Sequence, residues 1–488
     1  MHESLRKFYL LSFISLVAAV LAACSSRPDA TIVITHVTVI DATGAPPQTD
    51  ATVIVTKSRI SAISASGSAQ IPPKAKVIDA TGKFLIPGLA DMHVHLTGAG
   101  EPSGSREFII PLLIANGITT VRDMGGSVAL LKKLRAEMES KERIGPQIFF
   151  TGPYLDGNPP SFQPSIVVQN AQEAAVAVDE LKLQGVDFIK VQSRLQPEAY
   201  FAIASESKKL GIRFLGHVPD SITAAQASDA GQASIEHLTG VLLGCSSREA
   251  QLRAEKLRVS KLSFTPSETR VEERTWLKTL LASIDQGTSA SLIAEFSRNR
   301  TWQVPTFPTL VHIGFVTPQT DLTNDARLRY VPGTVKSNWA QSRAAQLNGY
   351  GGEDFTLREG VISESLKVVG RMNAAGVPIV AGTDTAAPNV IPGFSLHEDL
   401  QYLVKAGLSP MQALQAATLR PAEFVGRSGE QGTIQVGKRA DLVLLDGDPL
   451  GDIRNTEKIR AVIVNGKLLD RVKLDAILAG VESYAATH

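Results

Sequence analysis

The chain has few cysteines that could form disulfides, and it lacks the excess of positive charge that would attract nucleic acid. Only two cysteines, Cys24 and Cys245, occur in 488 residues. The net charge is +1 and no long run of lysine or arginine stands out, so nothing recommends nucleic acid as a partner. Charged residues make up 20% and hydrophobic residues 43% of the chain, an ordinary globular composition that argues against long disorder. There is no low-complexity tract, and no repeat beyond an alternation of strand and helix.

An almost uninterrupted apolar run, residues 8–23, follows two basic residues near the N-terminus. It has the length of a signal-peptide core and is short for a membrane span, which needs about 20 residues. Small residues directly before Cys24 resemble a bacterial lipobox, although a plain secretory signal with an incidental cysteine has the same form. We therefore predict a signal peptide over residues 1–23, a lipidated Cys24, and export to a bacterial membrane. The two serines that follow favour the outer membrane. Lipidation would leave Cys245 without a disulfide partner.

Both ends of the chain are rich in β-strand signals. Alternating, β-branched residues predict strands over 31–40 near the start, and over 432–443 and 459–464 near the end. The simplest arrangement is one small β-sandwich, assembled from residues 30–87 plus 428–475, with a second unit inserted between the two segments.

The inserted unit, residues 88–427, alternates short apolar runs with amphipathic helices. A helix is predicted over 197–210, where proline occupies the first helical position and Gly211 follows the last. Eight strands with helical crossovers indicate an α/β fold, a parallel (β/α)8 barrel of the TIM type. Long insertions are expected within about 249–360, first charged and helical, then a polar, loop-like stretch at 315–359 that would cover the site. The eight apolar runs begin near residues 89, 117, 147, 186, 212, 233, 302 and 377.

Candidate metal ligands stand where these runs end, which is where the active sites of such barrels lie. His93 and His95 end the first run, and alternate residues of a strand point to the same face. Alone, this pair would also suit two histidines of a core. However, four of the nine histidines fall at three such ends, which packing hardly explains. Imidazole and carboxylate ligands suit zinc or a similar divalent ion. The candidates are His93, His95, His217, His237 and Asp384.

Lys190 ends the fourth run and is the unusual member of the set. Burial disfavours the charged form of a lysine, and a neutral amine can add carbon dioxide to form a carbamate. The two oxygens of a carbamate can bridge two metals. A lysine at this position is also explained by pairing with a carboxylate such as Asp187 or Glu236, and from position alone that pairing is favoured.

Together these motifs resemble the amidohydrolase superfamily, over nearly the whole mature chain. The specific matches are Pro-Gly-Leu at 87–89 leading to His95, and Gly-Lys-Arg-Ala-Asp-Leu-Val at 437–443. Gly-Pro-Tyr-Leu-Asp-Gly at 152–157 and Phe-Ile-Lys ending at Lys190 look like the imidazolonepropionase-related branch that includes Xaa-Pro dipeptidases. Lys190 matches the carboxylated, metal-bridging lysine of that branch. It argues against imidazolonepropionase activity, because imidazolonepropionase proper uses one metal and lacks this lysine.

The resemblance implies a binuclear site and hydrolysis of amide or peptide C–N bonds, on dipeptide-like (Xaa-Pro type) or N-acyl amino acid substrates. A hydroxide would bridge two metals ~3.5–4 Å apart and attack the carbonyl. Asp384 would take its proton and pass it to the leaving amine. The resemblance implies that the more buried metal is held by His93, His95 and Asp384. The second metal would be held by His217 and His237, and carboxylated Lys190 would bridge the two.

Other residues are weaker candidates. Tyr154, on the loop after the third strand, and Tyr330 and Trp339, in the insertion, are candidates to contact substrate. His397 is interpreted either as a partner of the site or as part of a helix start. The remaining candidates are given structural roles: a mutual Arg122–Asp123 pair, His36 and His312.

One departure bears on the substrate. Glycine follows the corresponding histidine in the Xaa-Pro dipeptidases, whereas Leu238 follows His237 here, in a loop that borders the substrate. Other chemistries on the same metals therefore stay open, namely those of a lactonase, an organophosphate hydrolase or a deaminase. A non-catalytic surface lipoprotein is a further alternative, against which the intact ligand set argues. We expect a small-molecule substrate and a homo-oligomer.

Overall fold

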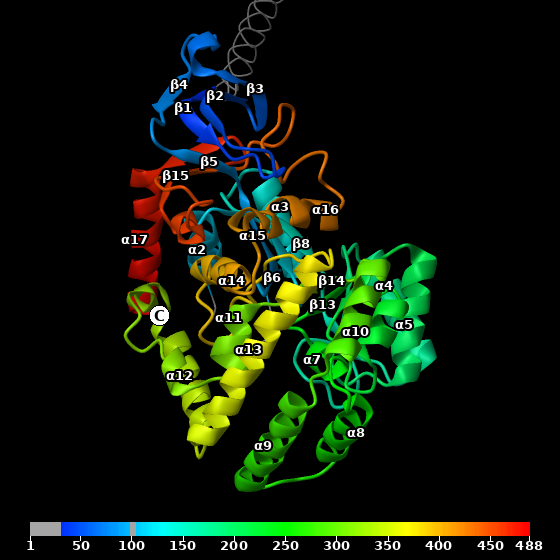
Figure 1. The fold of residues 1–488 in the computed structure, drawn as a ribbon. Coiled ribbons are helices and arrows are strands. Elements are labelled where there is room, and N and C mark those ends of the chain that lie inside the picture. Colours follow the sequence, from blue (N-terminus) through cyan, green and yellow to red (C-terminus); the bar gives the residue numbers. More distant parts are fainter. Residues whose placement is uncertain (1–30, 98–103) are drawn as a thin grey trace, which may run out of the picture.

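The computed structural model describes residues 31–97 and 104–488 (Figure 1). The predicted signal peptide and the predicted lipidation site, Cys24, lie outside the described residues. Within the described ranges, no helix has the length and apolar character that crossing a membrane requires.

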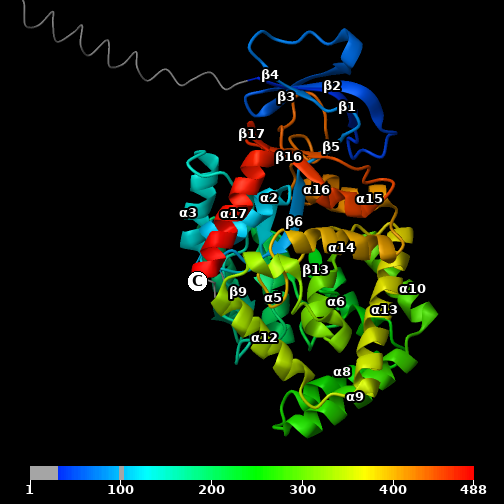
Figure 2. The ribbon, with the colours of Figure 1, turned by 90° about the vertical axis from the view of Figure 1, so that its left-hand side faces the viewer.

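Strands from both ends of the chain form one sheet at one end of the molecule (Figures 1 and 2). Antiparallel pairing of β5 with β15 joins the two sets, and the strand order is β17-β16-β15-β5-β1-β2-β3, with β4 paired to β1. The composite origin of this β-domain follows the sequence-based expectation. Its strands are β1 (Ile32–Val39), β2 (Gln48–Thr56), β3 (Arg59–Ala65), β4 (Lys76–Asp79), β5 (Phe84–Pro87), β15 (Leu442–Leu445), β16 (Ile459–Val464) and β17 (Lys467–Asp470).

Strand β15 connects the two hydrophobic cores of the molecule. Leu442 and Leu444 pack in the core of the β-domain, whereas Val443 and Leu445 pack in the core of the barrel. This division follows from the strand period of two, which turns alternate side chains to opposite faces. The sheet is therefore fixed to the barrel by apolar contacts along a central strand.

The inserted unit is a barrel of parallel strands. Its strands are β6 (Leu89–Val94), β7 (Ile118–Asp123), β8 (Gln147–Phe150), β11 (Ile189–Val191), β12 (Phe214–Gly216), β13 (Ser234–Glu236) and β14 (Trp302–Val304). The chain around Val380 forms no regular strand, but it makes parallel bridges on both sides, Gln303 to Ile379 and Val94 to Thr385. The predicted eighth strand thus occupies the gap between β14 and β6. Two further short strands, β9 (Tyr154–Asp156) and β10 (Ser165–Val167), follow β8, and β9 pairs with β11.

Local sequence signals account for the crossover helices. Asn170 caps α4 by accepting a hydrogen bond from the backbone N–H of Glu173, and Gly211 ends α5 in the left-handed conformation, with φ of 63°. The C-terminal helix, α17, packs against α2. The helices around the barrel and at the C-terminus are α2 (Ile110–Ala115), α3 (Val128–Glu139), α4 (Ala171–Leu183), α5 (Pro197–Leu210), α6 (Ala224–Asp229), α7 (Val241–Gly244), α14 (Phe394–Lys405), α15 (Pro410–Ala416), α16 (Leu419–Phe424) and α17 (Arg471–Thr487).

The insertion is mostly helical. The prediction of a loop-like stretch at 315–359 holds for residues 315–332, which form turns and two short 3-10 helices, and is wrong from residue 333 onward, where α12 begins. Its helices are α8 (Glu249–Val259), α9 (Pro266–Ala282), α10 (Gln286–Asn299), α11 (Phe307–Thr309), α12 (Gly333–Leu347) and α13 (Gly352–Ala374). Helix α12 buries only one residue, Trp339. Its sequence therefore lacks the periodic apolar pattern that predicts a helix. Contacts with other segments hold α12 in place: Arg343 donates hydrogen bonds to the backbone carbonyls of Thr317 and Thr320.

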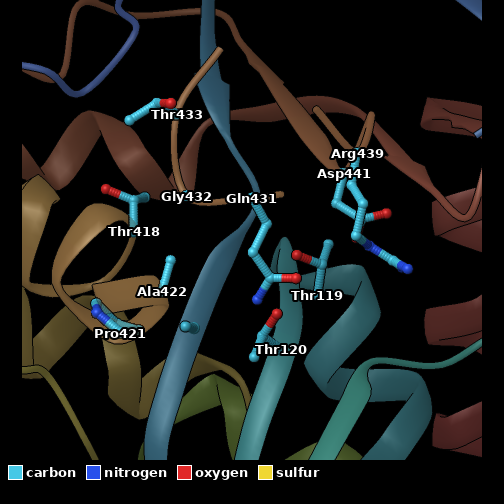
Figure 3. Close-up of a pocket in the computed structure, with 12 residues that line it drawn as sticks. Thr119, Thr120, Thr418, Pro421, Ala422, Gln431, Gly432, Thr433, Arg439 and Asp441 are labelled. Carbon is cyan, nitrogen blue, oxygen red and sulfur yellow. The ribbon is translucent and has the colours of Figure 1, made fainter. Parts of the chain in front are cut away.

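A small polar cavity lies where the β-domain meets the start of the barrel strands. Figure 3 shows Gln431 pointing toward Thr119 and Thr120 in this cavity. Its volume of about 20 Å³ is that of a site for a single water molecule. It is too small for a substrate, so a substrate site has to lie elsewhere, such as at the opposite, carboxyl-terminal face of the barrel.

Candidate metal centre

A pocket of about 820 Å³ opens at the carboxyl-terminal ends of the barrel strands. This volume is in the range of small-molecule sites. All six predicted metal ligands line it, although they come from five different strand ends: His93, His95, Lys190, His217, His237 and Asp384.

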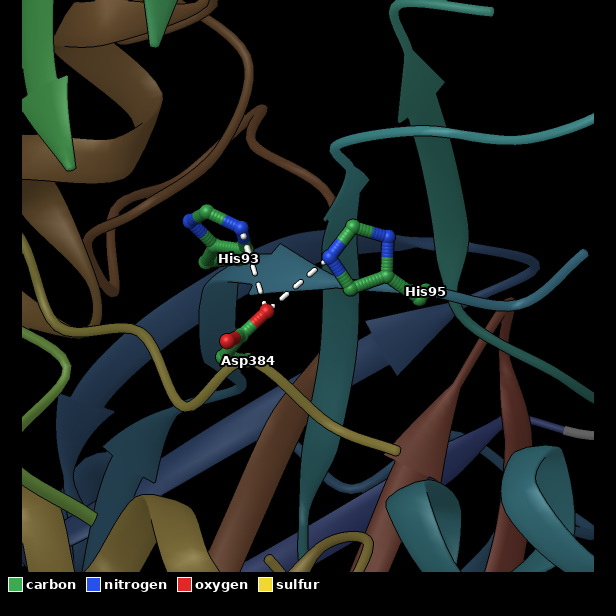
Figure 4. Close-up of side chains that lie close together, drawn as sticks. All are labelled: His93, His95 and Asp384. Carbon is green, nitrogen blue, oxygen red and sulfur yellow. Dashed lines mark hydrogen bonds and ion pairs between the residues drawn. The ribbon is translucent and has the colours of Figure 1, made fainter. Parts of the chain in front are cut away.

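Asp384 lies at the centre of the cluster. Its Oδ1 is 2.9 Å from His95 Nε2 and 3.3 Å from His93 Nε2 (Figure 4), and its Oδ2 is 4.0 Å from His237 Nε2. One ligand atom each from His93, His95 and Asp384 lie within 4.8 Å of one another. Two imidazole nitrogens and a carboxylate that converge in this way have the chemistry of a site for a divalent ion.

Each of the four imidazoles is fixed through its outer nitrogen. In every case Nδ1 contacts an oxygen atom, which leaves Nε2 available on the other side of the ring. Metal-ligating histidines are held in this way, because the outer contact sets both ring orientation and tautomer. The contacts are His93 with Glu236 Oε2 at 2.8 Å, His95 with Gly125 O at 3.3 Å, His217 with Ser193 Oγ at 2.9 Å, and His237 with Thr306 Oγ1 at 2.6 Å.

Arg122 and Asp123 do not pair with each other, contrary to the sequence-based expectation. Arg122 Nη2 donates to both oxygens of Glu236, at 2.9 and 3.0 Å. Asp123 accepts hydrogen bonds from the backbone N–H groups of Leu96 and Gly125. The reason is the strand period: adjacent residues of β7 face opposite sides, so only Arg122 reaches Glu236 across the barrel.

Lys190 is fully buried, with 1% of its surface exposed. Burial lowers the pKa of its amine to about 8, against the opposing effect of Glu236 and Asp384. Within the described residues neither suggested carboxylate forms an ion pair with it: Asp187 pairs with Arg135, and Glu236 is held by other groups. The alternative in which Lys190 is a paired structural lysine therefore has no support in the geometry.

The ionisation states suit metal binding. Burial, aided by the charge of Lys190, holds the pKa values of His93 and His217 well below the ordinary value, and burial lowers that of His237 to about 4. These imidazoles are neutral at physiological pH, as ligands must be. Burial also disfavours charge on His95 and Asp384, but other effects outweigh it. For His95 these are the hydrogen bond and attraction to Asp384; for Asp384 they are the attraction to His237 and the hydrogen bond and attraction to His95. The pKa of His95 is raised and that of Asp384 is lowered.

Four residues at the site have a backbone conformation that is unusual for residues other than glycine. The φ angles are 57° at His237, 52° at Leu238, 48° at Thr306 and 68° at Asp384. Such conformations cost energy and are found mainly where the surrounding structure fixes a functional group. Leu238, the residue that departs from the dipeptidase pattern, is also buried.

The weaker candidates divide into two groups. Tyr154 and Trp339 line the pocket, and the Tyr154 hydroxyl is 3.3 Å from His95 Nδ1. Tyr330 is not among the lining residues; its ring is buried and stacks on Phe394 at a centroid distance of 5.7 Å.

The other histidines have structural partners. The His397 side chain is buried and contacts Thr456 Oγ1 at 2.9 Å and the backbone carbonyl of Asn116 at 3.2 Å, away from the pocket. His36 pairs with Asp50 and His312 pairs with Glu398.

The residues that support the ligands, above all Glu236 and Gln192, were not predicted from the sequence as parts of the site. Gln192 lines the pocket two positions after Lys190 and is 3% exposed. A signal was present for Glu236, because it and Ser234 place polar side chains at alternate positions of a strand buried on both faces. Buried polar groups at such positions require partners inside the barrel.

Residues 84–469 match the model of the Amidohydrolase family. The chain belongs to the amidohydrolase family. It is a hydrolase acting on carbon–nitrogen bonds, with the barrel and additional β-domain of that family. A curated relative is the imidazolonepropionase of Pseudomonas aeruginosa strain UCBPP-PA14, 25% identical over 396 residues, which span 78% of this chain and 83% of the relative.

Solved structures share the fold. Bottromycin amidohydrolase matches with a TM-score of 0.71 and 21% identity, over 94% of this chain and 91% of its own. A Xaa-Pro dipeptidase with bound methionine in the active site matches with a TM-score of 0.61 and 21% identity, over 90% of this chain and 100% of its own.

Proposed function

We propose that this amidohydrolase uses two divalent metal ions, zinc being the best fit to the donors, to hydrolyse amide bonds. The observation that carries the proposal is the convergence of six predicted ligands on one pocket. His93, His95 and Asp384 would hold one ion, and His217 and His237 the other. Lys190, carboxylated on its neutral amine, would bridge them.

The donor set supports this assignment. Four imidazoles have their outer nitrogens occupied, and the amine of Lys190 is buried without an ion-pair partner among the described residues. When bound, the ions would supply Lewis acidity to the scissile carbonyl and lower the pKa of water toward ~7.

Asp384 is the proposed proton carrier. Its lowered pKa keeps the carboxylate ionised at neutral pH, so it can accept a proton from the attacking water. The same group then donates that proton to the nitrogen of the leaving amine. The strained backbone at Asp384, with φ of 68°, holds the carboxylate at the centre of the cluster.

The likeness to a Xaa-Pro dipeptidase supports dipeptide-like or N-acyl amino acid substrates as the first to test. The test is to purify the chain, measure its metal content, and follow hydrolysis of an amide library by mass spectrometry before and after chelation. We expect turnover that chelation abolishes and divalent metal restores.

Replacing Lys190 with alanine should sharply lower both metal content and activity. Lys209→Ala is the matched control, because Lys209 is an exposed lysine that pairs with Glu206 far from the pocket. A Lys190→Ala variant with full metal and full rate would falsify the bridging assignment.

We further propose that the mature protein begins at a lipidated Cys24 and is exported to the outer membrane as a homo-oligomer. The support is the apolar run before Cys24 and the small residues that end it. Mass spectrometry of the N-terminal peptide from native and Cys24→Ala protein would test lipidation, and light scattering of the detergent-solubilised protein would test assembly.

A further inference from the structure

Beyond the metal ligands, the described residues that line the pocket have no charged side chain. Among the described residues that line the pocket, the only lysine, arginine, aspartate or glutamate side chains are those of Lys190 and Asp384, both assigned to the metals. The rest of the wall is neutral, and much of it is apolar: Phe162, Ile313, Val335, Trp339, Ala386 and Pro388.

The described part of this wall offers no cationic partner for a carboxylate on the substrate. Arg122 is fully buried and held by Glu236, and Lys190 would itself be an anion when carboxylated. When bound, the metal ions would place their charge beside the scissile bond, and Asp384 and the carbamate on Lys190 would offset part of it. A carboxylate that leaves water without a cationic partner loses its hydration without an equivalent replacement, which weakens binding.

The apolar part of the wall is built for a bulky group. Trp339 comes from α12 and is 5% exposed, whereas Phe162 is 58% exposed and lies after β9. The cavity of about 820 Å³ holds a ring-sized substituent in addition to the reacting bond. Aromatic side chains favour such a substituent through burial and ring contacts.

Gln192 supplies one neutral polar contact. Its Oε1 is buried and has no hydrogen-bond partner within the described residues. Because Gln192 follows Lys190 by two positions, it lies on the same side of the strand as the site. A buried acceptor left unsatisfied destabilises the protein, and a donor on the substrate would remove that cost.

We propose that the natural substrate is an uncharged amide that has a bulky apolar substituent and an N–H group that donates to Gln192. This inference rests on the proposed amide hydrolysis, and it replaces the dipeptide-like and N-acyl amino acid substrates suggested by structural likeness with a neutral class. It favours neutral acyl amides over free dipeptides and N-acyl amino acids, since both of the latter have a carboxylate.

The experiment uses matched pairs on the metal-loaded full chain. Each pair is an N-acyl amino acid and its primary amide, such as N-benzoylglycine and N-benzoylglycinamide, so that the scissile bond is the same. We expect kcat/KM to be at least about tenfold higher for the neutral members. Equal or faster turnover of the carboxylates would overturn the inference while leaving amide hydrolysis intact. Metal-loaded protein that cleaves no amide would overturn the proposed function and the inference together.

Two variants sharpen the test. Asn338→Arg places a cation on the pocket side of α12 and should raise the ratio of carboxylate to neutral turnover by about tenfold. Ser337→Arg, on the same helix but outside the lining, is the control and should leave that ratio unchanged. Gln192→Leu should lower kcat/KM for N–H substrates more than for their N-methyl analogues. A merely structural role of Gln192 would lower both equally, and that result would refute its part in recognition.

Discussion

Glu236 holds His93 and Arg122 with the same carboxylate. Its Oε2 is 2.8 Å from His93 Nδ1, and both of its oxygens accept from Arg122 Nη2. All three side chains are almost completely buried. The metal ligand His93 is therefore oriented by an ion pair that the barrel encloses, so the site and the core depend on the same group.

Glu236→Gln should weaken both functions of this carboxylate. Loss of the support for His93 should reduce metal affinity by about 10–100-fold. Loss of the negative charge leaves Arg122 buried without a counter-ion, which should lower the free energy of unfolding by about 3–5 kcal/mol. Metal titration and urea unfolding measure the two effects.

Glu398→Gln is the matched control for that variant, because Glu398 also pairs with a histidine, His312, at 2.8 Å but outside the pocket. It should leave metal affinity unchanged. Equal metal affinity in the two variants would contradict the assigned role of Glu236.

The pKa of Lys190 makes carboxylation of the apoprotein depend on pH. Only the neutral amine adds carbon dioxide, and the neutral fraction rises as pH passes through the pKa of about 8. At constant dissolved carbon dioxide, activation by metal should be roughly 20-fold faster at pH 8.5 than at pH 6.5, and should level off above about pH 9. If the rate of activation instead kept rising tenfold per pH unit above pH 9, the pKa of Lys190 would not be lowered.

Much of the site followed from the sequence because each ligand directly ends a short apolar run. His217 and His237 could be placed without knowing how the strands pair, since a parallel barrel brings all such ends to one face. Glu236 could not be assigned, because its partners His93 and Arg122 are more than 100 positions away in the chain. Only the closed barrel brings them together.

The insertion shows the opposite limit. Helix α12 has one buried side chain, Trp339, and so has no amphipathic pattern in the sequence. Tyr330 and Trp339 looked alike as candidates, and only their tertiary positions separate a stacking residue from a pocket residue. The composite sheet, by contrast, was predictable from alternating residues at both ends of the chain.

Gly216 is required beside Lys190. Its φ is 132°, and a Cβ there would lie 2.3 Å from the Val191 carbonyl oxygen and 2.9 Å from Lys190 Cδ. Gly216→Ala should therefore lower stability by more than about 2 kcal/mol and reduce metal content. Gly211 also has a left-handed φ, but the space around it is open. Gly211→Ala should therefore lower the free energy of unfolding by only about 1 kcal/mol and leave the metal content unchanged. Thermal unfolding and metal analysis of both variants test this difference. Equal losses of stability and of metal in the two variants would contradict the special role of Gly216.

Leu238→Gly tests whether the departure from the dipeptidase pattern is structural. Glycine relieves about 1–2 kcal/mol of left-handed strain at φ of 52°, but loss of the buried leucine costs about 2–5 kcal/mol. We expect a net destabilisation of about 1–3 kcal/mol in urea unfolding, with metal content unchanged. A more stable variant would mean that the leucine contributes no packing energy.

The number of divalent ions bound per chain, measured by elemental analysis of the active protein, tests the two-metal account most directly. The account predicts about two ions per native chain, loss of activity as they are removed by chelation, and far fewer ions in Lys190→Ala. Full activity with one ion or none per chain would contradict it.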